Sequence, residues 1–440
     1  MDLLKDDIKK VYFKYLAASV GSVLITTVYS LVDMAMVGQY EGPAGAAALA
    51  VVAPVYNIIF GLGMLAGIGG SVLYGVARGS GKKEEADRSF TAAMIFALLL
   101  AVFAWALIFF FTEELLLLFG ADEEILPIAM EYLAPIRFAV PCFVSTELLA
   151  AFLRNDSDPV RATAAVLSGG IFNMVGDWFF VFALDMGAFG AGLATAIGGA
   201  VGMCVALTHF VSRKNTLRLV WPTGFFRRVG RVISNGFSAF FNDVSMGIVT
   251  TLFNRQIMRY LGGDVLSVYS AIMNTGVMVQ CCAYAVGQSA QPVLSVNFGA
   301  MQRERIRKTA KCALVAAVCI GAAWMSFAMI WPNAVVRFFM KPTAEVLAIA
   351  PAIIRRYAPA FLLLGINVFS AYYFQSVMQA GLAFGVSVAR GCVVSSALVM
   401  LLPAVLPAEN IFFAAPLTEL LIAVPVLILM FRPMKFPKEA

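Results

Sequence analysis

Charged residues are scarce in this sequence. Asp, Glu, Lys and Arg make up 13% of its 440 residues, whereas 61% are hydrophobic, and the mean hydropathy is +0.86. Soluble domains carry about 25% charged residues, so this chain has too few polar side chains to cover a soluble surface. It is also far too apolar to be a disordered chain. The composition therefore predicts an integral membrane protein.

The residue patterns that build catalytic and metal centres are missing from the sequence as well. His209 is the only histidine, which excludes a histidine-based triad and a multi-histidine metal site. The seven cysteines show no CxxC or Cys/His spacing, so neither a disulfide framework nor a zinc site is predicted. No GxxxxGK[ST] loop is present to bind a nucleotide. The net charge of +6 is scattered over short connections, which argues against nucleic-acid binding. We expect no enzyme and no cofactor.

Long apolar runs dominate the remaining sequence. A helix that crosses a bilayer needs roughly 20 apolar residues, and the alternating ten-residue strands of a membrane barrel are absent. The sequence therefore predicts an all-α membrane protein with twelve transmembrane helices, the first of them retained rather than cleaved as a signal peptide. The expected spans lie near residues 11–37, 46–77, 90–112, 127–152, 160–184, 188–212, 233–261, 265–298, 310–331, 350–379, 382–406 and 409–431.

The distribution of Lys and Arg predicts the orientation of these spans. Basic residues gather in the N-terminal segment, the even-numbered connections and the C-terminal tail, whereas the third connection is acidic. Because cytoplasmic loops are enriched in Lys and Arg, both termini are expected in the cytoplasm. We expect the protein in the inner, or plasma, membrane.

An internal repeat predicts two halves. Residues 69–88 align with residues 289–308 at half the chain length, and both segments end an even-numbered span. We predict two pseudo-symmetric six-helix lobes, residues 1–212 and 233–440, joined by a cytoplasmic linker over residues 213–232. Such a repeat interface is where transporters commonly bind substrate. Phe225 and Phe226 lie among arginines in the linker, which fits either a helix on the anionic leaflet or a solvated connection.

Ionisable side chains inside the predicted spans are the main functional candidates, because they are costly in hydrocarbon. They are Asp33, Glu147, Asp177, Asp243, Glu419, Arg137, Arg255, Arg259, Arg355, Arg356 and Arg390. At about 1.5 Å of rise per residue, Asp33 and Asp177 lie at similar depths in the outer half of the first lobe. Asn173 shares a helix face with Asp177, and Thr195 in the next span has a similar depth.

This first-lobe cluster has two chemical uses and one structural alternative. Two nearby carboxylates away from water cannot both be ionised at low cost, so one holds a proton. The carboxylate, amide and hydroxyl oxygens of Asp33, Asn173, Asp177 and Thr195 also suit a hard cation such as Na⁺. Alternatively, these groups serve only as hydrogen-bonding partners between helices.

The second half does not repeat this chemistry. Position 253, which corresponds to Asp33, is Phe, and Asn254 is only an approximate counterpart. Asp243 is the main acid of the second lobe, where it either attracts a cationic substrate or pairs with an arginine such as Arg255. Asp243, Asn254 and Gln288 are the candidate substrate contacts.

Several short motifs resemble one known family. They are VDMAMVG (32–38), RNDSDP (154–159), NMVGDWFFVF (173–182), GAFGAGLATAIGG (187–199) and AQPVLSVNFGA (290–300). In order and spacing they are similar to the MATE (multidrug and toxic compound extrusion) family over the whole chain. The chain departs from that pattern at Ser157, where the family often has Gly, and in its tenth span, which lacks an acid.

The resemblance implies a V-shaped pair of six-helix lobes that exports organic cations in exchange for Na⁺ or H⁺ by alternating access. It also implies that the first-lobe cluster binds the coupling ion. The expected partners are amphipathic cationic drugs and the lipid bilayer, with the protein a monomer. The alternatives are a flippase or exporter of lipid-linked saccharides on a related plan, and a non-transporting membrane receptor or scaffold.

Overall fold

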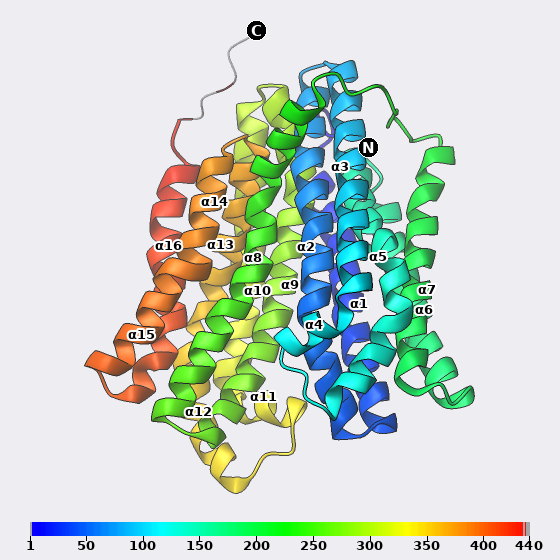
Figure 1. Cartoon of the computed structure of the whole chain (residues 1–440). Helices are drawn as coiled ribbons and strands as arrows, with labels where there is room; N and C mark the ends of the chain where they lie inside the picture. Colours follow the sequence, from blue (N-terminus) through cyan, green and yellow to red (C-terminus); the bar gives the residue numbers. More distant parts are fainter. Residues whose placement is uncertain (1, 434–435, 437–440) are drawn as a thin grey trace. The chain divides into compact units, whose positions relative to one another are not determined.

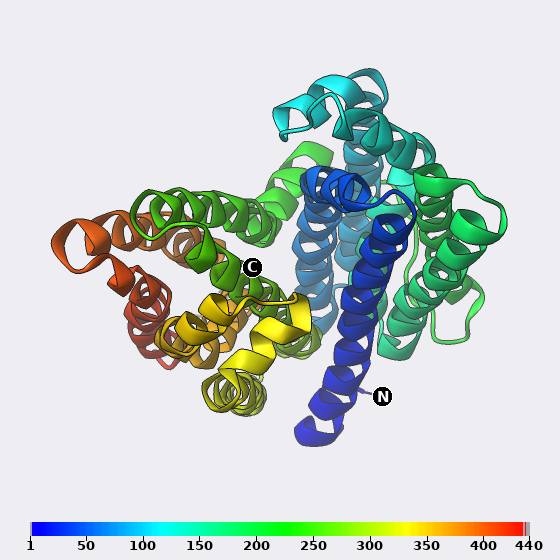
Figure 2. The same ribbon diagram turned by 90° about the horizontal axis from the view of Figure 1, so that it is seen from below.

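A computed structural model describes residues 2–433 and residue 436 of the chain, and in this part it is built from helices and their connections (Figure 1). Contacts divide the chain into two compact units. The first unit comprises Met1–Asp6 and Ala17–Phe240, and the second comprises Asp7–Leu16 and Phe241–Ala440. Figure 2 shows the helices of each unit from below. The predicted lobe and linker boundaries stay a prediction.

The helices occur in the order that the apolar runs predict. The first unit contains most of α1 (Ile8–Tyr40) together with α2 (Pro43–Gly79), α3 (Lys83–Phe110), α4 (Thr112–Leu118), α5 (Ile125–Asn155), α6 (Pro159–Asp177), the π-helix η1 (Trp178–Ala183), α7 (Gly187–Leu207) and the 3₁₀-helix η2 (Thr208–Val211). After α8 (Phe225–Tyr260), the second unit contains α9 (Gly263–Gly299), α10 (Arg303–Ile330), α11 (Pro332–Phe339), α12 (Ala344–Tyr357), α13 (Pro359–Ser376), α14 (Ala380–Val388), the π-helix η3 (Ala389–Val394), α15 (Ser395–Val405), the 3₁₀-helix η4 (Ala408–Phe413) and α16 (Ala414–Met430).

Eleven helices within the described residues are long and apolar enough to cross a membrane, against the twelve predicted. The remaining predicted span, residues 233–261, lies in α8, which is continuous over 36 residues but more polar than the others. Its polarity has a clear source, since Arg227, Arg228 and Arg231 lie near its start and Arg255 and Arg259 near its end. The sequence analysis did not predict the short helices α4 and α11, because both are much shorter than a membrane-spanning helix.

The internal repeat extends to the boundaries of the helices. Helices α2 and α9 both contain 37 residues and begin 220 positions apart, and α3 and α10 both contain 28 residues at the same offset. The turns match as well, because Gly42 and Gly262 both have positive φ, with values of 74° and 85°. Each unit thus folds from the same local plan.

Glycines allow the helices of the first unit to pack with their backbones close together. A Cβ atom at Gly192 in α7 would lie 2.0 Å from the carbonyl oxygen of Tyr132 in α5. A Cβ atom at Gly169 in α6 would lie 2.7 Å from the carbonyl oxygen of Gly198 in α7. Small residues of this kind are typical of helix interfaces in membranes. Here they bring α5, α6 and α7 together around one set of polar side chains.

A buried polar junction closes one end of this unit. His209 in η2 is fully buried, and its Nε2 and Nδ1 lie 2.8 Å from Asp156 Oδ2 and 3.3 Å from Asp158 Oδ2. Both aspartates belong to the turn between α5 and α6. The Nζ of Lys214 donates to Asp158 Oδ1 at 3.1 Å, and the backbone N–H of Thr216 donates to Asp156 Oδ2 at 2.8 Å. The junction fastens the chain after α7 to the α5–α6 turn.

Replacing His209 by Ala should destabilise the protein more than replacing Lys214. His209→Ala leaves two buried carboxylates without a main partner, and such a loss costs about 3 kcal/mol of unfolding free energy. The Lys214 side chain is 62% exposed, and an exposed ion pair contributes less than about 1 kcal/mol. Thermal unfolding in detergent, followed by tryptophan fluorescence, measures both variants. Equal melting temperatures for the two variants would contradict this account of the junction.

Candidate functional site

The four polar residues predicted to form a site in the first half lie together in the first unit. Asp33 comes from α1, Asn173 and Asp177 from α6, and Thr195 from α7. All four are buried, and Asp177 is fully so. The Nδ2 of Asn173 donates to Thr195 Oγ1 at 2.9 Å and to Asp177 Oδ1 at 3.3 Å. Asp33 and Asp177 are close enough for their charges to interact. We refer to these four residues as the first-unit cluster.

Tyr132 joins the cluster from α5. Its hydroxyl donates a hydrogen bond to Asp33 Oδ2, and its ring packs edge-on against Tyr56 of α2 at 6.5 Å between centroids. The sequence analysis missed Tyr132, because a tyrosine in an apolar helix has no distinctive spacing. The sequence could still have marked Tyr132 as a candidate, because a buried tyrosine hydroxyl generally needs a polar partner.

Three oxygen atoms of the first-unit cluster lack a hydrogen-bond partner within the described residues. They are Asp33 Oδ1, Asn173 Oδ1 and Asp177 Oδ2. Buried polar atoms are normally satisfied, so an unsatisfied group in a native protein calls for an explanation. All three are oxygens, and a hard cation or a proton supplies what such atoms lack. Within the described residues no group of three or more His, Cys, Asp or Glu side chains is arranged to hold a metal ion, so any cation at this cluster would also need the amide oxygen of Asn173.

An irregular turn of helix begins immediately after Asp177. Helix α6 ends at that residue and continues as the π-helix η1. Single π-turns are rare and frequently occur at functional sites. A π-helical turn is wider than an α-helical one, so the side chains after Asp177 point in different directions from those of α6. Asp177 is therefore the last residue on the regular helix face that it shares with Asn173.

The substrate contacts predicted in the second half are Asp243, Asn254 and Gln288, and the described part of the chain does not test them as a group. Asp243 lies in α8, but its side chain is outside the described residues. Asn254 is a half-buried residue of the same helix, and Gln288 in α9 has a buried Oε1 without a partner in the described chain. Neither Asn254 nor Gln288 lines the pocket of the second unit. The roles proposed for all three stay predictions.

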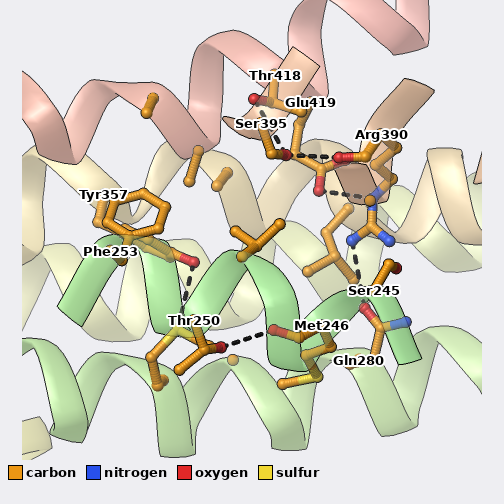
Figure 3. A pocket seen from close by; sticks show the side chains of 18 of the residues that line it. Ser245, Met246, Thr250, Phe253, Gln280, Tyr357, Arg390, Ser395, Thr418 and Glu419 are labelled. Carbon is orange, nitrogen blue, oxygen red and sulfur yellow. Dashed lines mark hydrogen bonds and ion pairs between the residues drawn. The ribbon is translucent and has the colours of Figure 1, made fainter. Parts of the chain in front are cut away.

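Two other ionisable residues of the second half do meet. Arg390 of η3 donates from Nε to Glu419 Oε1 of α16 at 2.8 Å. The pair lies on the wall of a pocket that is built entirely from the second unit (Figure 3). The sequence marked both residues as costly in hydrocarbon but offered no reason to pair them across 29 positions.

Comparisons with known sequences find one family model and relatives of one kind. A family model described as MatE matches residues 18–179 and 239–400. The multidrug export protein MepA of Staphylococcus saprophyticus is 22% identical over 365 residues, which cover 82% of this chain and 79% of the relative. MepA of Staphylococcus haemolyticus is 22% identical over 392 residues, which cover 87% and 84%.

Solved structures show the same likeness of fold. One is described as the outward-facing conformation of a multidrug resistance MATE transporter of the MOP superfamily, with a TM-score of 0.89, 20% identity and coverage of 97% of this chain and 96% of the other. A MOP superfamily transporter from Pyrococcus furiosus, whose description reports a binding pocket of reverse polarity, has a TM-score of 0.90 at the same identity and coverage.

Removing the hydroxyl of Thr195 should weaken the first-unit cluster. Its Oγ1 accepts from Asn173 and donates to the carbonyl oxygen of Ala191 at 3.0 Å. Thr195→Val keeps the shape but leaves the Asn173 amide short of an acceptor, at a cost of about 1–3 kcal/mol. Thr195→Ser keeps the hydroxyl and should unfold close to the wild-type temperature. If thermal unfolding ranks the two variants in the opposite order, the hydrogen bond is not what stabilises this region.

Proposed function

The chain belongs to the MatE family of multidrug transporters, and we propose that it is a secondary active antiporter that exports amphipathic organic cations in exchange for Na⁺ or H⁺. Its relatives include proteins described as multidrug export proteins, which supports drugs as the exported class. The apolar helices support a multi-pass protein of the membrane. The basic connections support cytoplasmic termini in the plasma membrane.

One observation carries the coupling role: the first-unit cluster contains three buried oxygens without partners in the described chain. A group of hydrogen-bonding side chains that only held helices together would leave few such atoms, because an unmet buried acceptor costs about 1–3 kcal/mol. A bound Na⁺ takes several oxygen ligands, as hard cations do. A proton on one carboxylate removes the repulsion between Asp33 and Asp177. Either ion gives the cluster two states of different charge.

These two states supply a means of coupling. When the ion binds, the charge on the carboxylates of α1 and α6 is neutralised, and Tyr132 and Asn173 adjust their hydrogen bonds to it. We propose that this change shifts α1 in the outward-facing state and lowers the affinity for the drug. The drug then leaves, and the ion departs to the cytoplasm once the protein faces inward. An ion that binds one state better than the other shifts the equilibrium by that difference in affinity.

The experiment is ethidium flux in proteoliposomes under a sodium gradient and, separately, under a proton gradient. Asp33→Asn and Asp177→Asn remove the charge on which either ion depends, and we expect each to lower gradient-driven flux at least about tenfold, equivalent to about 1.4 kcal/mol. The gradient that drives flux in the wild type identifies the coupling ion.

Asp185→Asn is a matched control, because it is the same substitution at an exposed residue of the same unit. Asp185 accepts a hydrogen bond from Tyr40 and lies at φ 54°, a conformation that asparagine tolerates. It should transport at the wild-type rate. Wild-type flux in Asp33→Asn and Asp177→Asn, at normal expression, would refute the coupling role of the cluster.

A further inference from the structure

The segment that joins η2 to α8 carries the most exposed apolar side chains in the described part of the chain. Val211, Trp221 and Phe226 are 88%, 86% and 88% exposed, more than any other large hydrophobic residue there. Val211 ends η2, Phe226 lies at the start of α8, and Trp221 belongs to the non-helical stretch between them. We refer to residues 211–228 as the η2–α8 segment. Apolar side chains gathered in this way generally mark an interaction surface.

The η2–α8 segment is fastened to the first unit, which fixes the direction of its side chains. It passes the start of α3 (Figure 1), where the backbone N–H of Val220 donates to Thr91 Oγ1 at 3.0 Å. Leu217 and Pro222 are buried against the protein. Trp221 lies between Val220 and Pro222 and faces away from the protein, since it is almost fully exposed. The apolar side chains are therefore presented by a fixed stretch of chain.

The contact with Thr91 places this segment at the level of the membrane surface. Five of the eight residues of α3 before Thr91 are charged, whereas no charged residue follows it before the helix ends at Phe110. A helix divided in this way leaves the headgroup region and enters the hydrocarbon near the boundary. Tryptophan is enriched at this level of membrane proteins, where its ring lies among the lipid headgroups. The exposed indole of Trp221 is thus at a depth that suits it.

The segment and the first turns of α8 are also strongly basic. No Asp or Glu occurs between Asp185 and Asp243, whereas this interval contains Arg213, Lys214, Arg218, Arg227, Arg228 and Arg231. Lys214 pairs with Asp158 at 3.1 Å, and Arg231 pairs with Glu85 at 3.7 Å. Arg213 and Arg227, by contrast, are exposed and form no ion pair within the described residues. Basic clusters beside a membrane span attract anionic lipids.

We propose that the η2–α8 segment binds the surface of an anionic phospholipid leaflet, with Trp221 and Phe226 inserted among the headgroups and Arg213 and Arg227 on lipid phosphates. An indole combines an apolar body with one N–H, which fits a boundary between hydrocarbon and water. A guanidinium can hold a phosphate through two parallel hydrogen bonds. The proposal concerns the membrane surface and does not depend on the proposed antiport.

This proposal chooses between the two alternatives that the sequence leaves open, a helix on the anionic leaflet and a solvated connection. The lipid surface is kept, but the anchor is different. Trp221 lies outside the helices, and Phe225 is half-buried whereas Phe226 is exposed. A solvated connection would leave three large apolar side chains in water beside a lipid surface that could bury them.

Trp221 itself serves as the probe in the test. Its emission is the difference between the wild type and Trp221→Phe, because the chain contains five tryptophans. The full-length protein is placed in nanodiscs of equal parts phosphatidylcholine and phosphatidylglycerol, with brominated acyl chains on one lipid or the other, so that only the position of the quencher differs. We expect a relative association at Trp221 about fivefold in favour of phosphatidylglycerol, the ratio that about 1 kcal/mol gives. Both leaflets of a nanodisc have the same composition, so the result does not depend on orientation.

A double variant tests the arginines. Arg213→Gln together with Arg227→Gln should abolish the preference for phosphatidylglycerol, while both brominated lipids still quench Trp221 because the aromatic side chains remain. The matched control is Arg337→Gln together with Lys341→Gln. It removes two exposed basic residues near the end of α11 that form no ion pair within the described chain, and the preference at Trp221 should persist.

Several results would overturn the proposal. If neither brominated lipid quenches Trp221, the surface faces water or a protein partner. Equal quenching by the two lipids in the wild type would mean that the anionic charge is not recognised. A preference that survives without Arg213 and Arg227, or that is lost in the control, would refute the role of these arginines. The wild-type comparison decides the main claim even if a variant fails to insert, and no arm of the test reads ethidium flux.

Discussion

The cost of placing a polar group out of water determines most of this structure. Buried polar groups must find partners inside the protein, and the two units meet that requirement differently. In the second unit, Glu419 is satisfied by Arg390 and Asn367. In the first unit, Asp33 and Asp177 have donors from Tyr132 and Asn173 but each retains an oxygen without a partner in the described chain. The first unit thus keeps buried oxygens without partners in the described chain, whereas the charges on the wall of the second-unit pocket are paired.

Close backbone packing makes both arrangements possible. Gly192 lets α7 approach the carbonyl oxygen of Tyr132 in α5, about one turn of helix before Thr195 of the cluster. Gly391 does the same for η3 and α8 beside the pocket. Without a hydrophobic force between helices in lipid, such contacts and interhelical hydrogen bonds provide the association energy. The polar side chains therefore both form the sites and hold together the helices that carry them.

The sequence predicted the first-unit cluster because depth in a membrane can be counted. A rise of about 1.5 Å per residue places Asp33, Asp177 and Thr195 at a common level, and the spacing of four places Asn173 beside Asp177. The same counting cannot show which helices are neighbours. Tyr132 and the pairing of Arg390 with Glu419 depend on neighbours, and so they required the structure. Helix α8 illustrates a related limit, since its many polar residues reduce the apolar signal that defines a span.

Because the two units share their helix boundaries, they can be compared position by position, and one such position carries a charge in the first unit only. Helices α2 and α9, and likewise α3 and α10, keep their lengths at one constant offset, so the scaffold of the repeat has been retained. Within that scaffold Asp33 corresponds to Phe253, which lines the pocket of the second unit. One position thus carries a carboxylate in the first unit and a ring in the second. A repeat that kept its helices but exchanged a carboxylate for a ring at this position gives the two units different polarity at the same place in one scaffold.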